Sequence, residues 1–462
     1  MYSVGLDIGT TSVCGILVDV ASGEIKKSLT LDNNTFIKTE NSFEKIQDAK
    51  KLIEIAKKIL EELTEKQKPV CIGITGQMHG IVYLNDKGEA LSPLKIWQDG
   101  RGDEPYKNGL SYAEYMSEIT GYPLATGYGA VTYFYDSVNG LVPEGTAKFC
   151  TIHDLLAMTL SGRAAPLVHT SDAASLGLFN LKENKFDTNA IKTLGLNPEL
   201  FPEVCDGFKL VGNHGDIPVS AAIGDNQASF SGSVKAPENA ILINVGTGSQ
   251  ISCFSQAVPE NKNIDCRPLL SNSYIMAGSS LCGGRSYALL EKLFREVAEA
   301  VTGEKVKSAY PAMDKIMEGY SGENSLKVST LFDGTRQNPE KRGKIENIST
   351  ENLNMAALCD GFMWGMVDEL YGMFEEMKPY VKNEKTLLVG SGNGIRNNAP
   401  LRKRFEEKFG IKMQMPAGKE EAAFGAILYS LVAAGIKTDF NEAATLIKYV
   451  EERFLCKTNL IF

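Results

Sequence analysis

One short pattern occurs in each half of the chain. Residues 7–12 read Asp-Ile-Gly-Thr-Thr-Ser, and residues 244–249 read Asn-Val-Gly-Thr-Gly-Ser. Both stretches stand between two apolar runs, so each predicts a strand, a tight turn and a second strand. Two matching turns are far less expected by chance than one, and 462 residues are too many for one ordinary core. The chain is therefore predicted to contain two similar α/β halves.

The residues around the first turn follow one topology. Apolar and β-branched runs predict strands over 2–8, 13–20 and 24–31, and a later strand over 70–75. Between them, Ser42 is predicted to cap a long amphipathic helix, with apolar residues at helical spacing and Lys and Glu on the other face. Three strands, a helix and another strand describe the opening of a ribonuclease-H-like half-domain.

The first turn carries groups that suit a phosphate. Asp7 stands at the end of its predicted strand, and Thr10, Thr11 and Ser12 follow. Backbone N–H groups and hydroxyls can cradle phosphate, while the carboxylate holds Mg²⁺ through water. The second turn has Asn244 in place of Asp7, as expected if both turns meet one nucleotide and only one needs a charge for the metal. The alternative is a plain hairpin whose polar side chains satisfy local hydrogen bonds.

A single carboxylate follows the apolar run over 219–223. The run ends in Gly224, and then come Asp225, Asn226 and a stretch of small residues. This pattern predicts a carboxylate at the end of a strand or at a helix N-terminus. Asp225 is a candidate catalytic residue, although a lone Asp after Gly is more often a cap or turn residue. The glycine-rich turns elsewhere in the chain favour the catalytic interpretation.

Two loops carry the polar and aromatic side chains that typically hold a sugar. These are Gln77, Met78 and His79 in the first loop and Trp97, Asp99 and Arg101 in the second. An aromatic face stacks on the C–H groups of a sugar, while amide, carboxylate and guanidinium groups bond to its hydroxyls. A structural histidine and a structural Trp–Arg stack are the alternatives for the two loops.

The stretch between these loops and Asp225 is predicted to be partly helical. Apolar spacing from Leu155 to Leu160 indicates a helix that stops at Gly162. Residues 170–175 then predict a small polar loop. Asp172 in this loop is a candidate either for a substrate contact or for a cap.

A glycine-rich stretch follows a predicted strand in the second half of the chain. Residues 387–394 predict a buried strand that breaks into glycines, and a helix is predicted from about Asn398. Closely spaced glycines such as Gly392 let the backbone lie flat against adenine, and Asn393 and Asn398 are candidates to bond its edge or the ribose. The spacing matches neither a P-loop nor a dinucleotide-binding fingerprint. Further helices are predicted over 286–301, 353–378 and 440–454.

Composition and charge exclude several classes of protein. The net charge of −9, with Lys and Asp/Glu interspersed, argues against a nucleic-acid partner. The nine cysteines are scattered singly, which is typical of reduced thiols and of neither a disulfide framework nor a zinc site. The first residues run straight into a strand pattern, and no segment approaches the length of a membrane span. We expect a cytoplasmic protein with no membrane partner.

With these motifs in view, the chain resembles the FGGY carbohydrate kinases of the actin/hexokinase ATPase superfamily over nearly its whole length. Residues 6–12 and 243–252 are similar to the two phosphate motifs, and 387–398 to the adenosine motif. The loops at 76–80 and 97–101 resemble the ketose-specific branch of sedoheptulokinases and xylulokinases, and the whole combination is most similar to the sedoheptulokinases. Two departures exist. Val-Thr-Tyr-Phe-Tyr at 131–135 replaces a Lys-x-x-Trp-Leu signature, and the adenosine loop is a residue or two longer, which leaves Asn397 and Asn398 as alternatives.

The resemblance implies an architecture. It implies an α/β fold of two ribonuclease-H-like domains, of the actin/hexokinase type, with an interdomain cleft. The N-terminal domain, 1–228, would bind the sugar and supply the base, and the C-terminal domain, 229–462, would bind the nucleotide. A homodimer is the assembly that the family suggests.

The resemblance also implies roles for single residues. Asp225 would be the catalytic base, and Asp7 would lie near Mg²⁺. The ketose would contact Gln77, Met78, His79, Trp97, Asp99, Arg101, Asp172 and Asn226. ATP would contact Thr10, Thr11, Ser12, Gly246, Thr247, Gly284, Gly392, Asn393 and Asn398.

The expected function is ATP-dependent phosphorylation of the terminal primary hydroxyl of a ketose, with sedoheptulose giving sedoheptulose 7-phosphate. A D-xylulose kinase is the first alternative, because the chemistry is the same on a shorter ketose. A non-catalytic sugar-binding regulator on the same fold would be expected to lack the base, the metal carboxylate or a phosphate turn, and all are present. An actin-like ATPase acting on protein partners is disfavoured by the sugar-type loops at 76–80 and 97–101.

Overall fold

The computed structural model describes residues 1–450 apart from 262, 263, 271, 321, 323, 324, 336, 337 and 339. Two compact units divide the chain. Unit 1 holds residues 1–235, 267–274 and 418–448, and unit 2 holds 236–266, 275–417 and the end of the chain from Tyr449. The single cut predicted after residue 228 differs from this division, because a late segment of the chain returns to unit 1.

A seven-stranded sheet forms the centre of unit 1, in the order β14-β15-β6-β1-β2-β3 with β16 also paired to β6. The strands are β1 (Tyr2–Ile8), β2 (Ser12–Asp19), β3 (Ile25–Asp32), β6 (Pro69–Gly76), β14 (Leu210–His214), β15 (Ile217–Ser220) and β16 (Ile223–Gly224). β1, β2 and β3 are antiparallel neighbours, and β6 runs parallel to β1. The predicted opening of three strands, a helix and another strand is confirmed, and the structure adds that this last strand is parallel to β1.

The amphipathic helix α1 (Ala49–Thr64) begins later than the sequence predicts. Its apolar face, which includes Leu52 and Ile59, is buried, and Asp48 caps its N-terminus by accepting the backbone N–H of Lys51 at 3.2 Å. The predicted start at Ser42 is wrong. Three short strands form a small separate sheet. β4 (Phe36–Ile37) and β5 (Ile46–Gln47) precede the helix in the sequence, and β8 (Leu94–Lys95) follows it. The β5 pairing ties residues 46–47 to this sheet, so the helix cannot extend toward Ser42.

Further helices of unit 1 are α2 (Tyr112–Thr120), α3 (Gly129–Val138), α4 (Ile152–Ser161), α5 (Thr170–Leu176), α6 (Thr188–Thr193) and α7 (Asp225–Ser233). α4 ends, as predicted, at Gly162 in the left-handed conformation. The polar loop predicted over 170–175 is instead helical. There the ring of His169 caps α5 by accepting the N–H of Ser171 at 3.2 Å, a role that the small polar residues did not reveal.

A second sheet, most of it in unit 2, has the order β19-β20-β18-β17-β23-β24. Its strands are β17 (Ala240–Val245), β18 (Ser249–Ser255), β19 (Asp265–Leu270), β20 (Ser273–Ser280), β23 (Leu387–Ser391) and β24 (Met413–Gln414). β17 pairs antiparallel with β18 and parallel with β23, as β1 pairs with β2 and β6. The register also repeats: Asp7 lies opposite Thr75, and Asn244 lies opposite Ser391. The duplication seen in the sequence is therefore a duplication of topology.

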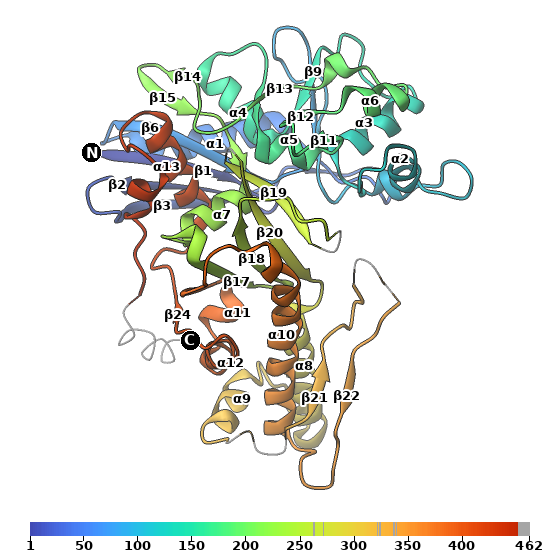
Figure 1. The fold of residues 1–462 in the computed structure, drawn as a ribbon, viewed down its shortest axis with the longest axis vertical. Helices are drawn as coiled ribbons and strands as arrows, with labels where there is room; N and C mark the ends of the chain where they lie inside the picture. The colour runs from blue at the N-terminus through green and yellow to red at the C-terminus, as the bar shows by residue number, and fades with distance from the viewer. Residues whose placement is uncertain are drawn as a thin grey trace. The chain divides into compact units, whose positions relative to one another are not determined.

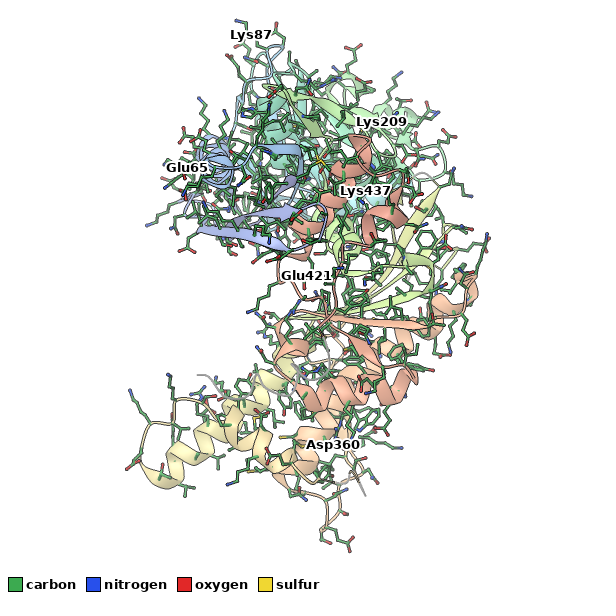
Figure 2. The ribbon with its side chains drawn as sticks, turned by 90° about the vertical axis from the view of Figure 1, so that its left-hand side faces the viewer. Glu65, Lys87, Lys209, Asp360, Glu421 and Lys437 are labelled. Atoms are coloured by element: carbon green, nitrogen blue, oxygen red, sulfur yellow. The ribbon has the colours of Figure 1, made fainter. Side chains whose placement is uncertain are left out.

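The long helices of unit 2 match the predicted positions. α8 (Gly283–Thr302) and α10 (Met355–Met377) fall on the predicted ranges 286–301 and 353–378, and α9 (Tyr310–Met317), α11 (Asn393–Arg396) and α12 (Ala399–Phe409) complete the unit. Asp360 on α10, labelled in Figure 2, pairs with Arg404 of α12 at 2.7 Å and joins the two helices. The last predicted helix, 440–454, is shorter: α14 spans Phe440–Ala444, and 451–454 lie outside the described residues.

Helix α13 (Glu421–Ala433) is the part of the C-terminal segment that packs on the first sheet, beside β1 and β6 in Figure 1. Its Ala- and Gly-rich sequence lets its backbone touch the strands directly. A Cβ atom added at Gly5 would lie 2.1 Å from the carbonyl oxygen of Ala423, and one added at Gly73 would lie 2.0 Å from that of Ala426. These glycines therefore hold the segment 418–448 in unit 1, which the linear order of the sequence did not suggest.

Two general features concern the cysteines and the helices. The cysteines of the described part of the chain are all free, and most are buried. Within that same part, every helix is too short or too polar to cross a bilayer.

The substitution Gly73→Ala tests the contact between α13 and β6. Its methyl group would overlap the backbone of Ala426, which cannot move aside as a flexible side chain could. We expect the free energy of unfolding to fall by about 2 kcal/mol, within the usual range for an overpacked core. Calorimetric unfolding measures the change.

Gly372→Ala on α10 is the matched control, because nothing lies within 4 Å of the added methyl group. Alanine also favours the helix, so this variant should gain up to about 1 kcal/mol. Equal stability of the two variants would contradict the close contact at Gly73.

Candidate functional site

Three parallel strands bring the two candidate carboxylates to one edge of the sheet in unit 1. β16 and β1 both run parallel to β6, with Ile223 and Asp7 each in register with Thr75. The carboxyl ends of the three strands therefore meet at one edge, the usual place for a ligand in an open α/β sheet. Asp7 lies near the end of β1, and Asp225 directly follows β16.

Asp225 is the first residue of α7, as the sequence predicted for a carboxylate at a helix N-terminus. The preceding Gly224 has no room for a side chain, because an added Cβ would lie 2.7 Å from the sulfur of Met78 and 2.8 Å from Oε1 of Gln227. The backbone N–H of Gly224 donates to the hydroxyl of Ser171 at 3.0 Å. Asp225 is thus set in place by close packing, while its side chain and that of Asn226 remain only half-buried.

Burial and neighbouring charges shift the pKa values of both carboxylates. Burial raises the pKa of Asp225 to about 6, and the charges of His153 and Arg267 oppose that rise. Burial also raises the pKa of Asp7 to about 7, with a further rise from the Asp225 carboxylate and an opposing effect from His153. A carboxyl group with a pKa near 6 suits a general base that works at neutral pH.

Helices α4 and α5 carry a wholly buried cluster of His153, Asp154 and Asp172. Nε2 of His153 is 3.0 Å from Oδ1 of Asp172, and Asp154 accepts a hydrogen bond from the Thr151 hydroxyl at 2.6 Å. Burial by itself favours the neutral ring, yet Asp172, Asp154 and Asp225 together raise the pKa of His153 to about 9. The ring therefore carries a positive charge at neutral pH.

This burial changes the interpretation of Asp172. The sequence made it a candidate for a substrate contact, but its side chain has no exposed surface and pairs with His153. Asp172 supports the site from behind, and the expected direct contact is corrected.

Asp99 and Arg101 require the same correction. Nε of Arg101 donates to Asp99 at 2.6 Å and its Nη1 to Asp136 at 2.6 Å, while Asp136 also binds Lys95 and the Tyr83 hydroxyl. Asp99 is 0% exposed and Arg101 2% exposed, so neither side chain can meet a sugar. Asp99 accepts the backbone N–H of Lys45 as well, at 2.9 Å. This buried network anchors the loop that presents Trp97.

Trp97 and His79 are the members of the two predicted sugar loops that keep exposed surface. Trp97 is 44% exposed, and His79 is half-buried in the left-handed conformation, with its Nδ1 2.7 Å from the carbonyl oxygen of Ser175. The ring of His79 stacks on that of Tyr128 at 4.6 Å between centroids. An added Cβ at Gly127 would lie 1.9 Å from the carbonyl oxygen of Trp97, so this loop approaches the tryptophan closely. The three rings offer aromatic faces that can stack on sugar C–H groups.

The first phosphate turn joins β1 to β2. Thr10 and Ser12 are half-buried there, and Thr11 is exposed. The Thr10 hydroxyl accepts the indole N–H of Trp97 at 3.0 Å and donates to Oε1 of Gln77 at 3.2 Å. The candidate phosphate turn and the candidate sugar loops are thus connected by hydrogen bonds within unit 1.

The candidate nucleotide motifs of unit 2 also meet at a sheet edge. The turn of Gly246 and Thr247 follows β17, and an added Cβ at Gly284, on α8, would lie 2.1 Å from the carbonyl oxygen of Gly246. Gly392 has a φ of 81°, and a Cβ added there would lie 2.5 Å from the carbonyl oxygen of Val245. Glycines that expose backbone N–H groups beside a helix N-terminus form a typical anion cradle.

The adenosine loop differs in detail from its prediction. Asn393 is exposed and begins the short helix α11, five residues before the helix predicted from about Asn398. Oδ1 of Asn398 caps α12 by accepting the N–H of Leu401 at 2.8 Å, whereas Asn397 is exposed. Of this pair, Asn397 is the better candidate for a nucleotide contact.

Sequence reasoning missed three residues of unit 1: His153, Tyr128 and Gln47. His153 beside Asp154 in an otherwise apolar helix was a signal, since a buried polar pair needs a partner. Tyr128 stands between two glycines, a second usable signal. Gln47 carries no local signal, because its partners come from distant loops.

The comparisons with known proteins agree with this geometry. The N-terminal domain of the FGGY family of carbohydrate kinases matches residues 2–232. Sedoheptulokinase from Mus musculus is 24% identical over 475 residues, which cover 93% of this chain and 97% of that relative.

Two solved structures from Lactobacillus acidophilus share the fold. Gluconate kinase has a TM-score of 0.82 at 18% identity and covers 97% of this chain and 92% of its own. Xylulose kinase has a TM-score of 0.80 at 18% identity, with coverage of 97% and 93%. These likenesses confirm the α/β fold of two ribonuclease-H-like domains. The family match over residues 2–232, half of the chain, establishes that the chain belongs to the FGGY family of carbohydrate kinases.

Proposed function

We propose that this carbohydrate kinase transfers the γ-phosphoryl group of ATP to the terminal primary hydroxyl of a ketose, with sedoheptulose as the substrate. The position of Asp225 carries the proposal. Its half-buried carboxylate lies at the sheet edge near Asp7, and the loops after β1 and β6 at that edge carry Thr10 and His79.

Asp225 acts as the general base in this proposal. It accepts the proton of the primary hydroxyl as the hydroxyl oxygen attacks the γ-phosphorus, and the bond from phosphorus to the ADP oxygen breaks. A positioned base typically contributes about 10²- to 10⁴-fold to the rate. The larger share comes from alignment and from neutralisation of the phosphate charges.

The residues present fit ATP and Mg²⁺. Asp7 has its pKa raised partly by repulsion from Asp225, and a divalent cation would relieve that repulsion. Thr11 and Ser12 offer hydroxyls in the turn after β1 of unit 1. In unit 2, taken by itself, the close approach of Gly284 to Gly246 forms a second candidate phosphate turn. Mg²⁺, when bound, would supply charge neutralisation of the phosphates.

Sedoheptulose is chosen over D-xylulose on two supports. The similarity to the mouse sedoheptulokinase covers nearly the whole of both chains. The loops that present His79 and Trp97 resemble those of the ketose-specific branch. Gln77, predicted to contact the sugar, is instead buried behind them. A D-xylulose kinase is the second candidate, because the same base and platform would serve a shorter ketose.

A substrate panel tests the proposal. ADP release with MgATP is measured with sedoheptulose, D-xylulose, D-ribulose, L-ribulose, D-fructose and glycerol. We expect sedoheptulose to have the highest kcat/KM, by about tenfold or more, which equals about 1.4 kcal/mol of transition-state stabilisation. A higher value for xylulose would replace the substrate and keep the mechanism. Bound ATP without turnover on any sugar would favour a sugar-binding regulator.

The substitution Asp225→Asn tests the base. The amide keeps the size of the carboxylate but cannot accept the proton, so kcat should fall at least about 10²-fold. The dissociation constants of sedoheptulose and ATP, measured by calorimetry, should change little.

Asp48→Asn is the matched control, since Asn caps α1 as well as Asp does and Asp48 lies on a different loop. Its kcat should equal that of the unchanged protein. Near-normal turnover of Asp225→Asn would remove Asp225 from the role of base.

The pH profile provides an independent test. Asp225 must be ionised to accept a proton, and burial raises its pKa from the ordinary 3.8 to about 6. The rate should therefore fall as the pH drops through about 6 and stay level above about 7. The measurement is kcat/KM for sedoheptulose between pH 4.5 and 8 with saturating MgATP, with approximate limits set one to two units around that pKa. An inflection near the ordinary carboxyl value would contradict the assignment.

A further inference from the structure

A closed ring of hydrogen bonds connects the candidate phosphate turn to the candidate sugar loop. The Thr10 hydroxyl donates to Oε1 of Gln77 at 3.2 Å, and the Gln77 amide donates to Oε1 of Gln47 at 2.9 Å. The Gln47 amide then donates to the carbonyl oxygen of Thr10 at 2.8 Å, which closes the ring. Trp97 joins these three residues as a fourth member, because its indole N–H donates to the Thr10 hydroxyl at 3.0 Å. We call these four residues the Thr10 ring.

Burial divides the members of the Thr10 ring into two kinds. Gln47 is 0% exposed and Gln77 only 3% exposed, so these amides face protein and not a ligand. Trp97 is 44% exposed, and Thr10 is half-buried in the turn. A sugar can therefore reach the ring at Trp97 and a phosphate can reach it at Thr10, with the two glutamines behind them.

The direction of the bonds fixes the Thr10 hydroxyl. Its oxygen accepts from Trp97 and its proton points to Gln77, because Oε1 of Gln77 can only accept. The bond between the two glutamines is buried, and the bonds that join them to Thr10 are partly buried. Hydrogen bonds in such a chain strengthen one another and favour a single arrangement. The orientation of the indole and the orientation of the phosphate turn therefore depend on each other.

This dependence has a thermodynamic consequence. A ketose that stacks on Trp97 restricts the indole, and the Thr10 ring passes that restriction to the turn. A phosphate that binds next meets a turn that has already lost its freedom, so ordering it costs less. Binding of either ligand should then strengthen binding of the other by the same factor.

We infer that Gln47 is a positioning residue that couples the sugar platform at Trp97 to the phosphate turn at Thr10. The inference rests on the proposed function and adds to it a route by which sugar promotes ATP binding. Gln47 touches neither substrate. It acts by holding the Thr10 carbonyl and the Gln77 amide in one arrangement.

Asn33 provides a comparison within the same turn. Its Nδ2 donates to the carbonyl oxygens of Gly9 and Thr10, both at 3.0 Å, and its side chain is also buried. Asn33 thus supports the turn as Gln47 does, but its side chain makes no bond to Gln77. A role in supporting the turn would be shared by both residues, whereas a role in coupling belongs to Gln47.

The test measures coupling by calorimetry. The dissociation constant of the non-hydrolysable analogue AMPPNP with Mg²⁺ is determined with and without saturating sedoheptulose, and again with D-xylulose. The ratio of the two constants is the coupling factor. For the unchanged protein we expect at least about fivefold, the lower end for coupled sites.

Two variants break the Thr10 ring at different points. Gln47→Met removes both amide bonds at similar volume, and Trp97→Phe keeps an aromatic face but loses the N–H donor. Each should reduce the coupling factor below about twofold, and the double variant should be no lower, because residues of one network are not additive. Asn33→Leu, the matched control, should weaken AMPPNP binding while keeping the coupling factor. If Gln47→Met does not fold, Gln47→Asn serves, because its shorter side chain cannot span both partners.

The outcomes separate this inference from the proposed function. A coupling factor near one in the unchanged protein, with normal ketose turnover, would overturn the inference alone. Equal loss of coupling in Gln47→Met and Asn33→Leu would also overturn it, because support of the turn would then suffice. Absence of binding and turnover with every ketose would instead overturn the proposed function.

Discussion

The parallel pairing of β16, β6 and β1 is the constraint on which the candidate site depends. It places Asp225 after one outer strand and Asp7 at the end of the other, with the glycine-lined end of β6 between them. No single segment could bring two carboxylates together in this way. Burial raises the pKa of both groups, to about 6 for Asp225 and about 7 for Asp7, and these shifts suit the base and the cation neighbour that we propose.

The same edge is stabilised by contacts that leave no room for side chains. The backbone of α13 packs directly against glycines in β1 and β6, and the side chain of Met78 packs directly against Gly224, next to Asp225. Close packing of this kind fixes positions better than flexible polar contacts do, because interiors at this density resist displacement. The returning segment 418–448 therefore supports the edge that carries the candidate site, although it comes late in the chain.

Two buried networks of charged side chains support the candidate site. His153, held positive by Asp172, Asp154 and Asp225, offsets the carboxylates from the interior. Arg101, Asp99 and Asp136 form a separate buried network that anchors the loop of Trp97. Each network contains ion pairs between buried side chains: His153 with Asp172 in one, and Arg101 with Asp99 and Asp136 in the other. The exposed ring of Trp97 and the half-buried rings of His79 and Tyr128 are then left for a ligand.

The sequence by itself determined the class of fold, the duplicated turns, most strands and long helices, and the place of Asp225 at a helix N-terminus, because these follow from local periodicity and turn chemistry. Tertiary structure decided which polar residues face a ligand. Asp99, Arg101 and Asp172 have the residue types of a sugar site, yet they are buried with ionic partners. Contacts with distant segments also decided where α1 begins. The same kind of contact gave a possible role to Gln47, Tyr128 and His153. Burial and pairing are properties of the packed chain, and residue type and spacing alone do not specify them.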